Sequence, residues 1–266
     1  MNISRKKTLV ASGVIAAALI MAYAESLAAR SSETELPRPS ADTVSAARAQ
    51  GIDLGRLTSS AGLHIVPLGD SPFRGPLAEQ MRVEIAQQAS AGSYVPASGD
   101  VPDLRMAAHT LQPAMSSTSL SSKRYRALTD ILPHLRYPPI ALDGTVLEGL
   151  PMVEATTAGG VSDGRWSGVT RSWEVAGLGF VQLDESEYRE TGGSITLVKE
   201  WLNSDVNGYP ATLKTMRSEN GATLVSISWV TDTTDFRLDL QPIHPEAVEA
   251  NQRTLLDLAR SLGGHR

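Results

Sequence analysis

Hydrophobic and polar positions alternate strictly along short segments in the second half of the chain. The clearest alternation puts Thr223, Val225, Ile227 and Trp229 on one face of a segment, and Phe236, Leu238 and Leu240 on one face of the next. A period of two is typical of β-strands with one buried and one solvated face. These segments therefore predict a sheet that is covered on one side.

Six strands are expected from this pattern and from the turn residues between them. They are Ser167–Val175, Gly179–Tyr188, Ser194–Trp201, Ala211–Arg217, Thr223–Val230 and Phe236–Leu240. Asn207-Gly208, Glu219-Asn220-Gly221 and Thr231–Thr234 supply turn chemistry between them. We expect an antiparallel meander of five to six strands.

The last segment predicts a helix that covers this sheet. It starts near Pro245 and ends at Gly263-Gly264, as helix boundaries favour. Its apolar stripe, with one polar interruption, consists of Val248, Gln252, Leu255, Leu258, Ala259 and Leu262. The predicted class is α+β.

Residues 123–266 form the expected globular domain. Within it a short helix should end at Pro133, and Asp143-Gly144 predicts a hairpin over 140–147. Residues 25–122 are rich in Ser, Ala, Pro and Gly and poor in aromatic residues, which is typical of a partly disordered spacer with short helices over 77–88 and 103–111.

The first 24 residues have the form of a signal peptide or a membrane anchor. Arg5, Lys6 and Lys7 precede an uncharged run that ends in Ala22-Tyr23-Ala24, a small-x-small pattern. The run would span about 24 Å as a helix, against about 30 Å for a bilayer core, which favours cleavage. The expected location is the periplasm, or the inner membrane if residues 8–24 stay attached as a tether.

Composition removes several classes of function. The 24 Lys and Arg against 29 Asp and Glu give a net charge of −5, which argues against nucleic-acid binding. The absence of cysteine excludes disulfides, thiolate metal sites and a cysteine nucleophile. The five histidines do not stand at metal-ligand spacings, so we expect no metal and no cofactor.

Two segments carry weak signals of catalysis. Gly160-Val161-Ser162-Asp163-Gly164 matches a nucleophile elbow in letters, but a strand before it and a helix after it are not predicted, so we interpret it as a loop. Asp184, Glu185, Glu187 and Glu190 could serve acid–base chemistry or calcium, although a solvated turn explains them better. No catalytic residue is therefore assigned.

Aromatic residues offer the best candidates for ligand or partner binding. All four tryptophans lie in the second half, and Trp229 belongs to the predicted core. The binding candidates are Trp166, Trp173, Trp201 and Tyr209, with Trp166 expected to be the most exposed.

Four segments in order carry a resemblance to a known domain. They are Asp205–Ala211 with its Val-Asn-Gly-x-x-Ala pattern, Leu224–Trp229, Phe236–Leu238 and Leu255–Leu262. Residues about 205–262 thereby resemble the C-terminal domain of unknown function in bacterial extracytoplasmic proteins related to sporulation and anti-sigma regulation. The resemblance implies a non-enzymatic sheet-and-helix module at the cell envelope, without ligand residues to transfer.

The sequence thus predicts an extracytoplasmic, non-enzymatic interaction or envelope-accessory protein of bacterial type, with a protein partner in the envelope. The alternative is a periplasmic carrier that binds an apolar or glycan ligand on an aromatic sheet face. The oligomeric state stays open.

Overall fold

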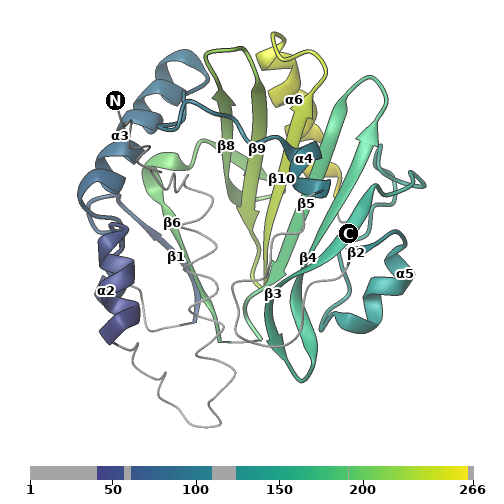
Figure 1. Ribbon diagram of the computed structural model, residues 1–266, viewed down its shortest axis with the longest axis horizontal. Coiled ribbons are helices and arrows are strands. Elements are labelled where there is room, and N and C mark those ends of the chain that lie inside the picture. Colours follow the sequence, from purple (N-terminus) through teal and green to yellow (C-terminus); the bar gives the residue numbers. More distant parts are fainter. Residues whose placement is uncertain (1–40, 57–60, 110–123, 191, 263–266) are drawn as a thin grey trace, which may run out of the picture.

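A computed structural model of the chain describes residues 41–56, 61–109, 124–190 and 192–262. Its main feature is an antiparallel sheet of eight strands in the order β2-β3-β4-β5-β10-β9-β8-β7 (Figure 1). The strands are β2 Arg124–Tyr125, β3 Glu154–Ser162, β4 Arg165–Val175, β5 Gly179–Glu187, β7 Ser204–Val206, β8 Tyr209–Arg217, β9 Thr223–Val230 and β10 Thr234–Pro242. The α+β class is confirmed.

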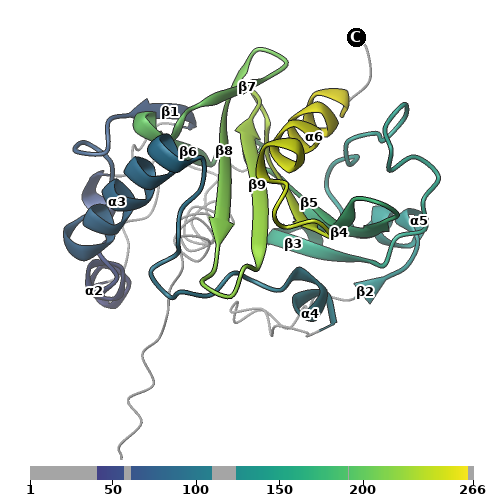
Figure 2. The ribbon, with the colours of Figure 1, turned by 90° about the horizontal axis from the view of Figure 1, so that it is seen from above.

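The C-terminal helix α6 (Val248–Ser261) covers one face of this sheet, as predicted. Its apolar stripe meets inward-facing residues of the central strands, because alternate residues of each strand point to the same side. The main core contains Trp173, Leu183, Val225, Ile227, Leu238, Leu240 and Leu255. We call the opposite side the second face; in Figure 2, α6 and α4 (Leu104–His109) lie on opposite sides of the sheet.

The topology differs from a simple meander. β6 (Ser194–Val198) pairs in parallel with β1 (Gly62–Val66) in a separate sheet of two strands. β5 instead pairs with β10, which joins the hairpins β3-β4-β5 to the meander β7-β8-β9-β10. Turn residues predict neighbours along the chain, whereas these long-range pairings depend on packing.

Two local predictions around the domain start are wrong. The glycine-rich segment expected to be a loop largely belongs to β3, whose register shifts between Ala158 and Val161. No strands form over residues 140–147; Asp143 and Gly144 lie in a turn, and Leu147 enters the main core. Helix α5 (Leu128–Ile131) is followed by a 3-10 turn, η2 (Leu132–His134), that contains Pro133.

A part of residues 25–122, from Leu68 to Leu104, packs on the sheet, so the interpretation as a spacer is wrong there. Both predicted helices occur, as α3 (Gly75–Ala91) and α4, after α2 (Ala41–Ala49) and η1 (Leu54–Arg56). A second core cluster joins this region to the sheet and to η3 (Lys199–Trp201): Leu68, Tyr94, Leu104, Phe180, Val198, Trp201, Met216 and Leu224.

The predicted signal or anchor segment, residues 1–24, lies outside the described residues. Within the described ranges, every helix is too short or too polar to serve as a transmembrane segment.

Candidate functional site: a polar belt on the second face

Two polar rows cross the second face, each with one residue from six adjacent strands, β8 to β3. The register aligns Thr212, Ser228, Arg237, Asp184, Thr170 and Thr156 in the first row. It aligns Lys214, Ser226, Asp239, Gln182, Ser172 and Glu154 in the second. We call these two rows the polar belt.

Charged groups at the centre of the belt are held by short hydrogen bonds. The Arg237 guanidinium donates through Nη2 and Nε to both carboxylate oxygens of Asp239, at 2.8 and 3.0 Å. Thr170 Oγ1 donates to Asp184 at 2.6 Å, and Gln182 Nε2 donates to the same carboxylate at 3.2 Å. The Arg237 side chain remains 25% exposed, whereas the Asp239 side chain is 1% exposed.

At one end of the belt a lysine lies over an aromatic ring. The Lys214 ammonium is 3.8 Å from the centre of the Trp201 ring, a cation–π contact. Burial lowers the pKa of Lys214 to about 8, against the opposing effect of the Glu84 carboxylate on α3. Trp201 is buried, and its indole Nε1 makes no hydrogen bond to any residue that the structure describes.

Asp235 lies on β10 two residues before Arg237, on the same face of the sheet, and it is opposite Ser186 of β5. Burial and the neighbouring Asp184 carboxylate raise the pKa of Asp235 to about 7, although Arg237 acts in the opposite direction. Since the folded state favours the protonated carboxyl, the folded protein binds more protons than the unfolded chain between pH about 4 and 7. Stability should therefore fall as the pH rises through this window.

Asp235→Asn is expected to remove this pH dependence. Asp235 is half-buried and keeps some solvent screening. We therefore expect the free energy of unfolding of the variant, relative to that of the parent protein, to be about 2 kcal/mol higher at pH 8 than at pH 5. Urea unfolding at both pH values measures this. Asp232→Asn, which removes an exposed carboxylate from the turn before β10, is the control. An equal gain in both variants would contradict the assignment to Asp235.

The structure does not bring the predicted aromatic binding residues together. Trp173, Trp201 and Trp166 are buried in three different clusters, and half-buried Tyr209 packs against the main core. The exposure expected for Trp166 is wrong, because its side chain packs in a cluster with Ile131, Leu135 and Val169. The backbone of residues 135–136 pairs beside it, where Arg136 N donates to Trp166 O at 3.0 Å. Trp201 contacts the belt through Lys214, and a binding role for these four residues stays a prediction.

The acidic cluster is divided by β5 rather than placed on a solvated turn. Asp184 joins the polar belt, whereas Glu185 and Glu187 face the other way and are buried in ion pairs with Arg171 and Arg136. Only Glu190 is exposed, beyond the strand end.

The elbow-like motif around Ser162 is a tight β-hairpin. Ser162 ends β3, and Asp163 and Gly164 both have positive φ, as a two-residue type I′ turn requires. A nucleophile elbow needs a helix after the serine, whereas β4 follows here.

The alternation in the sequence places Arg237 and Asp239 on the side opposite the buried face, but it does not indicate which strands lie beside β10. In the part of the chain that the structure describes, histidine and carboxylate side chains nowhere gather in threes as a metal site would need. Comparison of the chain with protein-family models, with curated proteins and with solved structures finds no match.

Proposed function

We propose that this chain is an extracytoplasmic, non-enzymatic interaction protein that binds a protein partner of the cell envelope through the polar belt. The observation that carries the proposal is the alignment of hydrogen-bonded charged groups, Arg237, Asp239 and Asp184, across adjacent strands of one sheet face. The extracytoplasmic location is proposed from residues 1–24, with either a cleaved signal or an inner-membrane tether.

The belt has the physical properties of a specific polar interface. Its charged groups are already partly desolvated and are held on a rigid sheet, so ordering them on binding costs less free energy. Lys214 makes no ion pair among the described residues, and it can pair with a carboxylate of the partner. Such charge pairs across an interface mainly determine which partner binds.

The carrier alternative would need an aromatic surface, but the predicted aromatic residues are divided among separate cores. It remains a prediction that no observation in the described residues favours.

Site-specific photocross-linking in intact cells tests the proposal. A photoreactive residue replaces half-buried Ser228 in the belt or, as control, exposed Arg253 on α6. We expect a defined cross-linked envelope protein from position 228 only, and an at least tenfold weaker product when Lys214→Glu reverses the neighbouring charge. The far-UV circular dichroism of each purified variant checks folding. Equal products from both positions, or none from position 228, would refute binding through the belt.

A further inference from the structure

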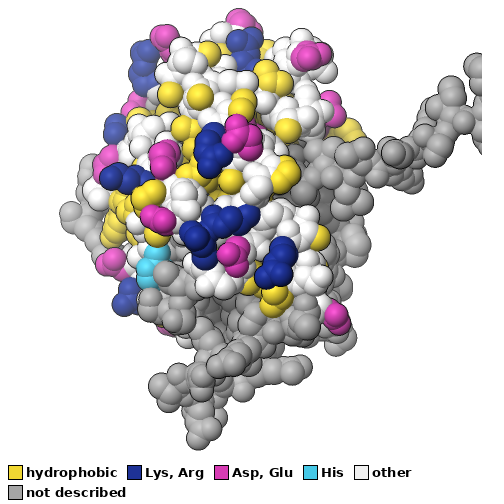
Figure 3. All heavy atoms as spheres, turned by 90° about the vertical axis from the view of Figure 1, so that its left-hand side faces the viewer, with side chains coloured by type: hydrophobic (Ala, Val, Ile, Leu, Met, Phe, Trp, Pro, Cys, Tyr) yellow, Lys and Arg dark blue, Asp and Glu magenta, His cyan; other side chains and the backbone are white. Residues whose placement is uncertain are grey.

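A pocket of about 280 Å³ lies where α3 begins, at a different place from the polar belt. Three arginines, Arg56, Arg74 and Arg82, line it together with the apolar Leu68, Phe73 and Ala78. Figure 3 looks at the side of the molecule that carries α2 and α3, and Lys and Arg side chains gather near the middle of this view with carboxylates among them.

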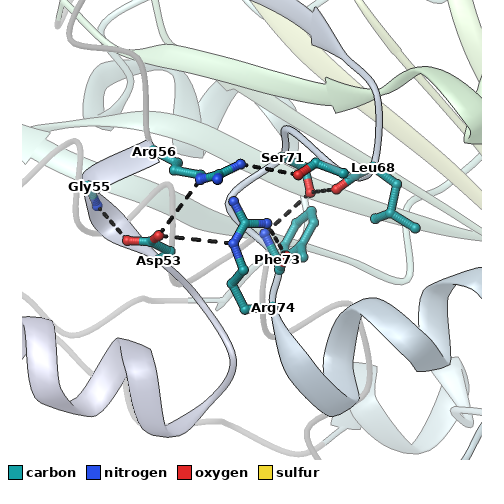
Figure 4. A network of polar contacts seen from close by, with 8 residues as sticks. Asp53, Gly55, Arg56, Leu68, Ser71, Phe73 and Arg74 are labelled. Carbon is teal, nitrogen blue, oxygen red and sulfur yellow. Dashed lines mark hydrogen bonds and ion pairs between the residues drawn. The ribbon is translucent and has the colours of Figure 1, made fainter.

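Backbone contacts fix two of the arginines relative to each other. Arg74 N donates to Gly51 O and Asp53 N donates to Pro72 O, both at 2.7 Å, and Ile52 pairs with Phe73 in an antiparallel bridge. A Cβ on Gly51 would lie 2.7 Å from the Arg74 carbonyl oxygen, so this close approach requires glycine. The 3-10 turn η1, which ends at Arg56, thereby lies beside the start of α3 (Figure 4).

The nearby carboxylates only partly neutralise these guanidinium groups. Asp53 Oδ2 is 3.9 Å from Arg56 Nε and 4.0 Å from Arg74 Nε, longer than hydrogen bonds. Glu79 pairs with Arg82 at 2.6 Å, and the Arg82 side chain is 57% exposed. Neither carboxylate lines the pocket.

The donors of Arg56 and Arg74 are only partly used by the protein itself. Arg56 Nη1 donates to Gly69 O at 3.1 Å, and Arg74 Nη1 donates to Phe73 O. Arg74 Nη2 is buried and has no hydrogen-bond partner among the residues that the structure describes. A buried donor without an acceptor is unfavourable by about 1–3 kcal/mol. The Arg74 side chain as a whole is 33% exposed, so a small shift of its guanidinium group would bring this donor to an oxyanion in the pocket.

We propose that this pocket binds a phosphate group that carries a short carbon chain. Guanidinium groups match phosphate oxygens with parallel hydrogen bonds, and the positive end of the α3 dipole adds to their attraction. Leu68, Phe73 and Ala78 offer an apolar wall for the carbon chain. A soluble phosphate monoester and a phospholipid headgroup both present this chemistry.

Titration of the full-length protein tests the proposal and identifies the source of the phosphate. The soluble probes are inorganic phosphate and glycerol 3-phosphate, followed by calorimetry; the membrane probes are vesicles of phosphatidylglycerol in phosphatidylcholine and of phosphatidylcholine alone, followed by sedimentation. Saturable binding of glycerol 3-phosphate supports a soluble ligand. Binding only to the phosphatidylglycerol vesicles supports a headgroup.

Variants establish whether the arginines are responsible. Arg74→Gln should weaken binding of whichever probe the parent protein binds by about tenfold or more. Arg82 is 57% exposed, so Arg82→Gln should fold even if Arg74→Gln does not, and it should also weaken this binding measurably. Arg253→Gln on α6 removes the same charge at a distance and should leave binding unchanged. Absence of binding to every probe, or an equal loss in Arg253→Gln, would overturn the proposal.

Discussion

Replacing Glu185 by alanine is expected to lower the free energy of unfolding by about 3–5 kcal/mol, because Arg171 would keep its buried charge without a counter-ion. The two side chains are 0% and 1% exposed, and Arg171 Nη2 donates to Glu185 Oε1. Ile140 is bound from both sides: its N–H donates to Glu185 Oε2 at 2.7 Å, and its carbonyl oxygen accepts from Arg171 at 2.9 Å. Chemical denaturation of the parent and the variant measures the change.

A matched pair on the second face is the control. Arg105 and Glu174 form a bidentate ion pair at 2.7 and 3.1 Å, but the Glu174 side chain is 52% exposed. Glu174→Ala should therefore lower stability by less than about 1 kcal/mol. A similar loss in both variants would show that burial of the Arg171–Glu185 pair does not determine its effect.

The second large effect is expected at Gly179, the first residue of β5. Its φ is +134°, and a Cβ there would lie 2.2 Å from the Gln241 carbonyl oxygen on β10. Gly179→Ala should lower the free energy of unfolding by more than about 3 kcal/mol, since backbone strain and a clash with a neighbouring strand combine. Thermal and denaturant unfolding measure the loss.

Gly177 in the same hairpin separates these two causes. Its φ is +77°, but a Cβ there would meet no atom within 4 Å. Gly177→Ala should therefore show only the conformational cost of about 1 kcal/mol. Equal losses at the two positions would mean that the approach of β10 to Gly179 has no effect of its own.

The second face shows where sequence reasoning reaches its limit. Alternation in the last strand put Arg237 and Asp239 on the side opposite Phe236, Leu238 and Leu240, and the structure agrees. In the sequence Asp184 instead groups with Glu185, Glu187 and Glu190, because acids that follow one another closely look like one cluster. Strand geometry sends successive side chains to opposite faces, and the β5–β10 register then aligns Asp184 with Arg237.

The phosphate pocket had no sequence signal at all. Arg56, Arg74 and Arg82 lie in a region that its composition assigned to a spacer. They meet because residues 51–53 pair with residues 72–74, and Leu68 and Tyr94 are buried in a cluster with sheet residues. Few aromatic residues suffice when the sheet supplies the rest of the core.

The sequence by itself determined the α+β class, the extents of most strands and the covering helix, because these depend on local periodicity and turn chemistry. Only the tertiary structure decided that β6 pairs with β1, that β5 pairs with β10, and that α3 and α4 pack on the sheet. The physical reason is that a strand edge or an apolar face can be satisfied by several partners, and the packing of the whole chain selects among them.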